Sequence, residues 1–181
     1  MNKFLIFALI LIAVFSCKTP EARKPVSSQS GSFIDASVER NKKLNAKEQA
    51  DINKIMEAQE NDYIASESGF WYYYNTKTEI DSLQTPKFGD IINYNYNVKA
   101  LNGSLIYSEE TIKTQTYAMD KQELFTGLRE GLKLMKPDET VTFIFPSQKA
   151  YGYYGDEDKI GRNTPLICKV TVNSITQNQN N

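Results

Sequence analysis

Apolar and polar residues alternate along one stretch of the chain, with apolar side chains at Ile92, Tyr94, Tyr96 and Val98. Such alternation is typical of a strand that buries one face. Residues 70–74, 104–108, 141–145 and 166–175 give further strand signals. Asn102-Gly103 has the form of a tight hairpin turn, which predicts that the Tyr96 strand pairs with the Ile106 strand.

Two segments show helical spacing instead. Residues 46–65 follow an Asn45–Glu48 pair that has the form of a capping box, so a helix is predicted there. This helix packs either on its own domain or against a partner helix. Residues 124–135 form an apolar stripe after a second capping pair, Asp120 and Glu123. Gly127 lies inside that stripe at a cost of about 1 kcal/mol relative to alanine, which indicates a close backbone approach.

A single amphipathic helix among antiparallel strands buries its stripe by lying across one sheet face. The sequence therefore predicts an α+β fold: an antiparallel half-barrel sheet of five to six strands wrapped on one amphipathic helix, with an additional N-terminal helix. We expect this domain to cover residues 70–181, with the N-terminal helix at residues 46–66.

Residues 1–16 are predicted to be an export signal. Lys3 precedes an apolar run over residues 4–15 that is too short to span a bilayer, which needs about 20 helical residues. Residues 14–17 resemble a bacterial lipobox, so Cys17 is expected to carry a lipid at the start of the mature chain. The alternative is an ordinary cysteine after a conventional signal peptide. The expected location is the cell envelope, anchored by lipid in the inner or outer membrane and facing the periplasm.

Residues 17–45 are predicted to be a flexible tether. Residues 18–45 contain six Lys or Arg against three Asp or Glu, two prolines and a serine-rich stretch, and they offer little apolar surface to bury. The positive charge suits either contact with anionic headgroups or a merely soluble linker.

Composition excludes several chemistries. The chain has no histidine, which rules out a Ser-His-Asp or Cys-His nucleophilic site and a His-ligated zinc centre. Its two cysteines form no CxxC pair, and its net charge of −1 argues against a nucleic-acid partner. No metal or cofactor is expected. Asp156-Glu157-Asp158 lacks the spacing of a calcium loop and is interpreted as a solvated acidic loop.

Four blocks in order, residues 96–106, 124–135, 146–152 and 160–175, resemble the FK506-binding-protein (FKBP) type of peptidyl-prolyl cis-trans isomerase. The resemblance covers about residues 86–176. With the lipobox, the chain is similar to the prolyl isomerase lipoproteins associated with gliding motility in bacteria. The resemblance implies X-Pro segments of envelope proteins as substrates, and subunits of an envelope machine as further partners.

The resemblance also implies site residues. The catalytic set would be Tyr96 as an aromatic wall, Phe125 through its backbone N–H, and Tyr151 through its hydroxyl. The pocket would further be lined by Ile106, Tyr107, Tyr117, Leu124, Leu128 and Cys168.

Three positions depart from the family pattern. Tyr107 stands where an aspartate is usual, and Gln115 and Cys168 replace aromatic residues. These changes are expected to lower turnover before they abolish peptide binding. Two interpretations therefore remain open at this point: a prolyl isomerase that assists folding, or a catalytically weak or inactive binding module or chaperone. Cys168, in mid-strand, is interpreted as a buried, inert thiol rather than a reactive one.

Overall fold

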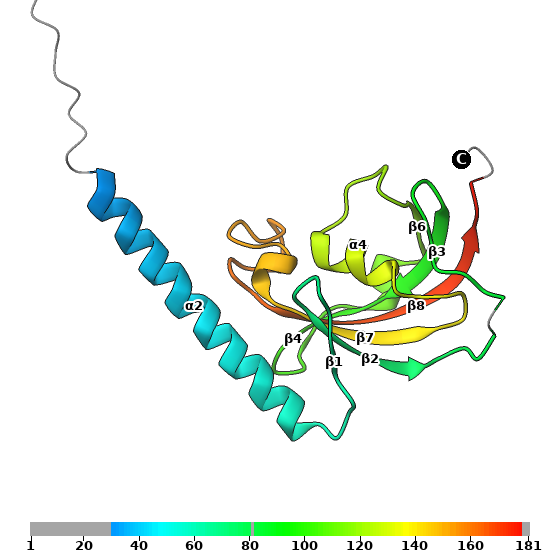
Figure 1. Cartoon of the computed structure of the whole chain (residues 1–181), viewed down its shortest axis with the longest axis horizontal. Coiled ribbons are helices and arrows are strands. Elements are labelled where there is room, and N and C mark those ends of the chain that lie inside the picture. Colours follow the sequence, from blue (N-terminus) through cyan, green and yellow to red (C-terminus); the bar gives the residue numbers. More distant parts are fainter. Residues whose placement is uncertain (1–29, 81, 179–181) are drawn as a thin grey trace, which may run out of the picture. The chain divides into compact units, whose positions relative to one another are not determined.

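The computed structural model describes residues 30–80 and 82–178. The chain divides into two units between Arg40 and Asn41. Helix α2, Ser30–Ala58, begins in the first unit and ends in the second, which holds all the strands of the described residues (Figure 1). The predicted export signal and Cys17 lie outside the described residues.

Helix α2 has different bounds from the helix predicted over residues 46–65. It begins at Ser30, so the predicted tether over residues 17–45 is corrected for its last part, residues 30–45. Residues 33–58 contain neither glycine nor proline and are rich in good helix formers, so local propensity sustains the helix over residues 33–47, where almost every side chain is exposed. It ends at Ala58, and the chain then turns and forms strand β1 at Ile64–Ala65.

The sheet of the described residues has eight strands, and every pairing is antiparallel. They are β1 (Ile64–Ala65), β2 (Trp71–Thr76), β3 (Ile91–Tyr96), β4 (Val98–Ala100), β5 (Leu105–Tyr107), β6 (Gln115–Ala118), β7 (Thr140–Phe145) and β8 (Leu166–Thr176). The order is β1-β2-β7-β8-β3-β6, and β4 pairs with both β5 and β8. The α+β antiparallel architecture is confirmed. The strands outnumber the predicted five to six because the strand expected over residues 90–100 divides at Asn97 and short strands add to the edges.

The predicted hairpin turn joins β4 to β5. Gly103 has a φ of 83°, which favours glycine, and its N–H donates to the Ala100 carbonyl at 2.9 Å. The Asn102 side-chain oxygen accepts from the Ser104 N–H at 3.0 Å. The resulting register pairs Val98 with Tyr107 and so fixes Tyr107 beside the strand that continues from Tyr96.

Helix α4, Thr126–Leu132, lies across one sheet face (Figure 1). A Cβ atom on Gly127 would lie only 2.5 Å from Phe145 Cδ1 and 2.7 Å from the Lys149 carbonyl oxygen, so the close approach is confirmed. The helix is shorter than the predicted residues 124–135. Its predicted cap is also corrected: Phe125 is the N-cap residue, without a side-chain hydrogen bond, and Asp120 lies in the preceding loop.

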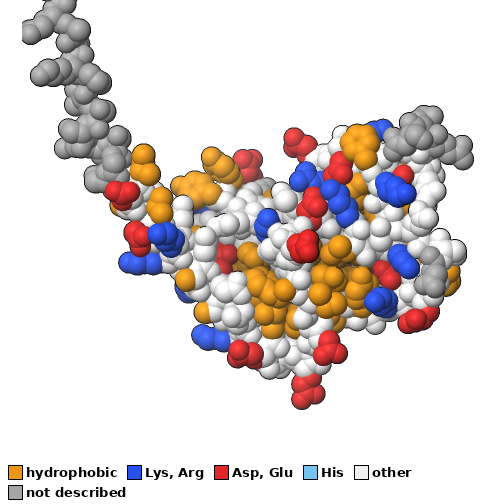
Figure 2. All heavy atoms as spheres, in the orientation of Figure 1, with side chains coloured by type: hydrophobic (Ala, Val, Ile, Leu, Met, Phe, Trp, Pro, Cys, Tyr) orange, Lys and Arg blue, Asp and Glu red, His pale blue; other side chains and the backbone are white. Residues whose placement is uncertain are grey.

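Two short helices, α3 (Glu109–Ile112) and the 3₁₀ turn η1 (Ser147–Lys149), complete the described elements. The core lies between α4 and the sheet, where the rings of Phe143 and Phe145 stack with centroids 5.3 Å apart. Figure 2 shows hydrophobic side chains gathered near the middle of the face that it draws, with charged side chains around them. Within residues 30–80 and 82–178, no helix has the length and apolarity that crossing a membrane requires.

Candidate active site

Tyr96, at the end of β3, is half-buried against the core. Its ring lies 5.6 Å from that of Tyr94, the preceding residue on the same face of the strand. The alternation along β3 predicts this shared face, yet Tyr94 was not among the expected site residues. Tyr94 is a buried core residue that supports Tyr96 from the same face of the strand.

Phe125 and Tyr151 meet at the start of α4. Their ring centroids are 5.2 Å apart, and Phe125 also packs edge-on against Phe145 at 5.5 Å. An open hollow of about 550 Å³ lies here and includes Leu124 in its wall. Its complete lining is Gln122, Glu123, Leu124, Phe125, Arg129 and Tyr151. Three of the expected residues, Leu124, Phe125 and Tyr151, thus line one recess.

Tyr96, on β3, is not part of the lining of this recess, but it lies close enough to Tyr151 for the two phenols to influence each other's ionisation. Burial raises the pKa of Tyr96 well above its usual range, and the neighbouring Tyr151 and Tyr94 add to the shift. Burial also raises the pKa of Tyr151, and the Asp156 carboxylate adds to that shift. Both phenols are therefore protonated at neutral pH and can donate hydrogen bonds.

The hydroxyls of Tyr94, Tyr96 and Tyr151 have no hydrogen-bond partner among the described residues. Every buried side-chain nitrogen or oxygen of the described residues has a hydrogen-bond partner. These three oxygens have none, so each of them must reach solvent. The Tyr96 and Tyr151 hydroxyls, on half-buried side chains, are thus available to a ligand, whereas Tyr94 is 2% exposed and lies deeper. Unpaired accessible donors suit binding of a peptide backbone, whose carbonyl groups are acceptors.

Other expected residues lie deeper. Leu128 and Cys168 are fully buried, and Tyr117 is 3% exposed. They belong to the core against which Leu124, Phe125 and Tyr151 pack, and a direct contact with bound peptide stays a prediction for them. Burial raises the pKa of the Cys168 thiol, in agreement with the inert interpretation. Ile106 is half-buried at the edge of the core, on the β5 side.

Two of the three positions that depart from the family pattern, Gln115 and Tyr107, have side chains that are hydrogen-bonded to other parts of the chain. The Gln115 side chain donates to the Ile112 carbonyl at 2.8 Å and is held by α3. The Tyr107 hydroxyl lies 2.5 Å from an Asp156 carboxylate oxygen. Asp156 is half-buried, so the interpretation of residues 156–158 as a wholly solvated loop is corrected for this residue.

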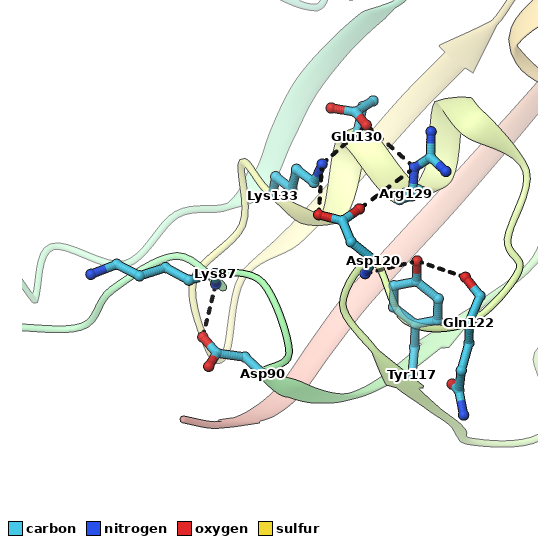
Figure 3. A network of polar contacts seen from close by, with 8 residues as sticks. All are labelled: Lys87, Asp90, Tyr117, Asp120, Gln122, Arg129, Glu130 and Lys133. Atoms are coloured by element: carbon cyan, nitrogen blue, oxygen red, sulfur yellow. Dashed lines mark hydrogen bonds and ion pairs between the residues drawn. The ribbon is translucent and has the colours of Figure 1, made fainter. Parts of the chain in front are cut away.

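A polar network holds the loop before α4 (Figure 3). The Asp120 carboxylate lies 3.1 Å from Lys133 Nζ and 3.7 Å from Arg129 Nε. The Tyr117 hydroxyl donates to the Gln122 carbonyl at 3.2 Å and accepts from the Asp120 N–H at 3.3 Å. The loop that leads to Phe125 is therefore tied to both β6 and α4.

Helix α2 is attached to the segment that carries Tyr151. The Glu48 carboxylate is buried and accepts from the N–H and the hydroxyl of Ser147, in η1, while Gln148 donates to Asn45 at 2.7 Å. The supposed capping pair at Asn45 and Glu48 therefore acts between elements instead of at a helix start. Of the two alternatives for this helix, packing within its own chain is the one that the structure shows.

The sequence profile of the family described as "FKBP-type peptidyl-prolyl cis-trans isomerase" matches residues 83–173, half of the chain. The chain belongs to this family. The match contains every strand and helix around the recess, from β3 to most of β8. The FKBP resemblance that the sequence blocks indicated is thereby confirmed.

Two curated FKBP relatives are similar to the chain. A probable FKBP-type isomerase, FkpA, of Neisseria meningitidis is 27% identical over 95 residues, which cover 52% of this chain and 35% of that protein. A probable FKBP-type isomerase of Haemophilus influenzae is 24% identical over 157 residues, covering 86% of this chain and 64% of that protein. The matched regions thus span less than two thirds of either relative.

Solved structures share the FKBP fold. A peptidyl-prolyl cis-trans isomerase from Pseudomonas syringae superposes with a TM-score of 0.61 at 18% identity, covering 75% of this chain and 96% of that one. FkpA from Escherichia coli superposes with a TM-score of 0.57 at 20% identity, covering 98% of this chain and 83% of that one. At these identities the likeness establishes the fold.

Proposed function

We propose that this protein is a peptidyl-prolyl cis-trans isomerase that acts on X-Pro bonds of cell-envelope proteins and so assists their folding. The observation that carries the proposal is the recess where Phe125 and Tyr151 meet beside Tyr96, in a chain of the FKBP family. Prolyl isomerisation needs no nucleophile and no proton transfer, so the aromatic rings and neutral hydroxyl donors of this site suit it.

The barrier of about 20 kcal/mol comes from loss of amide resonance in the twisted bond. A twisted amide is less dipolar than a planar one, so an apolar wall favours the transition state over the ground state. In this site the rings of Tyr96, Phe125 and Tyr151 supply the apolar wall. Each such effect contributes on the order of a few kcal/mol.

Fixed donors hold the flanking peptide while the bond twists. Phe125 is the N-cap residue of α4, and its backbone N–H has no partner among the described residues, so it is available to a substrate carbonyl. The Tyr151 hydroxyl also has no hydrogen-bond partner among the described residues. The Phe125 N–H and the Tyr151 hydroxyl can therefore donate to two carbonyl groups of the substrate, one on each side of the prolyl bond.

The test is acceleration of cis/trans exchange in a short X-Pro peptide by the chain from residue 27 onward. We expect micromolar protein to raise the exchange rate above the uncatalysed rate. An unchanged rate at that concentration would refute the catalytic proposal.

We further propose export and lipid anchoring through Cys17, which the lipobox at residues 14–17 supports. Cells that express the full chain with a labelled fatty acid should incorporate the label, and Cys17→Ser should abolish both incorporation and sedimentation with membranes. Retention of the label by the serine variant would contradict this. An assignment to gliding machinery rests on the architecture alone and stays a prediction.

A second candidate is a binding module or chaperone with little catalysis. The loss of aromatic residues at Gln115 and Cys168 favours it, because fewer rings enclose a proline. This alternative predicts that the chain binds X-Pro peptides, or suppresses aggregation of an unfolded protein, without speeding exchange. Exchange faster than the uncatalysed rate would refute it.

A further inference from the structure

The Tyr107 hydroxyl joins two segments that are far apart in sequence. It lies 2.5 Å from one oxygen of Asp156 and 3.0 Å from one oxygen of Asp158, and it accepts from the Lys159 N–H at 3.3 Å. A phenol has a single proton, so it donates to one carboxylate at a time. The shorter distance identifies Asp156 as the acceptor. This donor is therefore used within the protein and is not available to a substrate.

The Asp156 carboxylate also organises its own loop. Its second oxygen accepts from the N–H groups of Asp158 at 3.0 Å and Ile160 at 2.7 Å. Gly155, with a φ of 75°, is required at the start of this turn because a Cβ there would collide with the Ile160 carbonyl oxygen. The loop from Gly155 to Ile160 is thus closed around one half-buried carboxylate.

The Tyr107 ring is held on its face as well. Lys159 Nζ lies 4.9 Å from the ring centroid, a cation–π distance. Tyr107 is the last residue of β5, in the hairpin that follows the Tyr96 strand, whereas Asp156 follows Tyr151 by five residues. The contact therefore connects the hairpin that follows Tyr96 to the segment that follows Tyr151.

We infer that Tyr107 and Asp156 form a positioning pair that holds the Tyr151 segment against the hairpin after Tyr96 and brings the site's carboxylate from the loop instead of from β5. This assigns Tyr107 a role through Asp156, in place of the substrate contact expected from the sequence. Asp156 thus places a carboxylate next to the side chain at position 107, where the resemblance implies an aspartate. The inference rests on the proposed function, because positioning matters only for a site that binds prolyl peptide.

The charge of Asp156 has a consequence at Tyr151. A carboxylate nearby raises the pKa of the Tyr151 phenol, in the same direction as burial. Tyr151 therefore stays protonated as a donor. For Asp156 itself, burial opposes ionisation, but the hydrogen bonds from Tyr107 and from the loop N–H groups outweigh it and lower its pKa.

The kinetic test is a double-mutant cycle on the chain from residue 27 onward, with Tyr107→Phe, Asp156→Asn and the double variant. We expect each single variant to lose about tenfold in kcat/KM for an X-Pro peptide, with most of the loss in kcat, and the double variant to lose no more than either single one. The matched control is Glu157→Gln, which removes one negative charge from the same loop at an exposed position. Independent, multiplicative losses would overturn the pair, as would unchanged rates.

A second readout separates the pair from the isomerase proposal. NMR titration of the Asp156 carboxyl carbon should give a pKa below the ordinary value of about 3.9 in the wild type. Tyr107→Phe should raise it by about one unit, and Glu157→Gln should not raise it. If the wild type is active but Tyr107→Phe does not raise the pKa of Asp156, the positioning pair is refuted. If the wild type is inactive but Tyr107→Phe does raise the pKa of Asp156, the proposed function is refuted, while the Tyr107–Asp156 contact itself is established.

Discussion

Glu48 on helix α2 receives two hydrogen bonds from Ser147, one from the backbone N–H at 3.0 Å and one from the hydroxyl at 2.6 Å. Ser147 in turn accepts from the Gly152 N–H at 2.8 Å through its own carbonyl, directly after Tyr151. One buried carboxylate thus connects the N-terminal helix to the turn that carries a proposed catalytic hydroxyl. The part of α2 that lies within residues 41–181 is therefore attached to the sheet domain.

The substitution Glu48→Gln should destabilise the fold. An amide accepts through one oxygen only, so one of the two hydrogen bonds from Ser147 to the carboxylate is replaced by a weaker, neutral bond in which the Ser147 hydroxyl accepts from the amide. The expected cost is about 1–3 kcal/mol in the free energy of unfolding, measured by urea denaturation. Glu57→Gln, the same change at an exposed position of α2, is the control and should cost less than about 0.5 kcal/mol. Equal effects of the two would contradict the role of the Ser147 contact.

The substitution Gly127→Ala should destabilise the packing of α4. The added methyl group would overlap Phe145 and the Lys149 carbonyl oxygen, and the carbonyl is backbone that cannot rotate aside. Overpacking of this kind outweighs the gain in helix propensity and should cost about 1–3 kcal/mol. Thermal unfolding measures it, and a melting temperature equal to or above that of the wild type would refute the close approach.

The Cys168 thiol should resist modification in the native state. It is fully buried and its pKa is raised by burial, so the reactive thiolate is scarce and inaccessible. A disulfide reagent should react with the chain from residue 27 onward at least about a hundredfold more slowly in buffer than in denaturant. Comparable rates would show that β8 opens easily.

The Asp120–Lys133 contact should contribute stability that depends on pH. Burial lowers the pKa of Lys133, but the hydrogen bonds with Asp120 and Glu130 outweigh it and raise the pKa overall. A raised pKa means that the contribution is fully present below the ordinary value of about 10.4 and is lost as pH rises through the higher folded value. Both side chains are about a third exposed, so the effect is modest.

The difference in melting temperature between the wild type and Asp120→Asn checks this. It should be about 2 °C at pH 8 and should shrink above pH 10.4. A difference that grows with pH would contradict the assignment.

The local features of the fold were predictable from the sequence. The alternation around Tyr94 and Tyr96 marked β3, Asn102-Gly103 marked the hairpin, and Gly127 marked the closest contact of α4 with the sheet. Each of these depends on residues within a few positions of one another, where periodicity and turn chemistry apply.

The features that the sequence misassigned depend on distant partners. Asn45 and Glu48 have the spacing of a capping box, but their partners Gln148 and Ser147 lie 103 and 99 residues further along the chain. Tyr107 likewise finds its carboxylate 49 residues away. No local pattern distinguishes a polar pair that caps a helix from one that binds another element, so this part of the site required the structure.

The exchange rate of a short X-Pro peptide, measured with the chain from residue 27 onward and with Tyr151→Phe, tests the central claim most directly. We predict that the wild type accelerates exchange at micromolar concentration and that Tyr151→Phe lowers kcat/KM by about tenfold. Tyr154→Phe, which removes the hydroxyl of a tyrosine that is 80% exposed, should leave the rate unchanged. A wild type that does not accelerate exchange, or a Tyr151→Phe variant as active as Tyr154→Phe, would contradict the account.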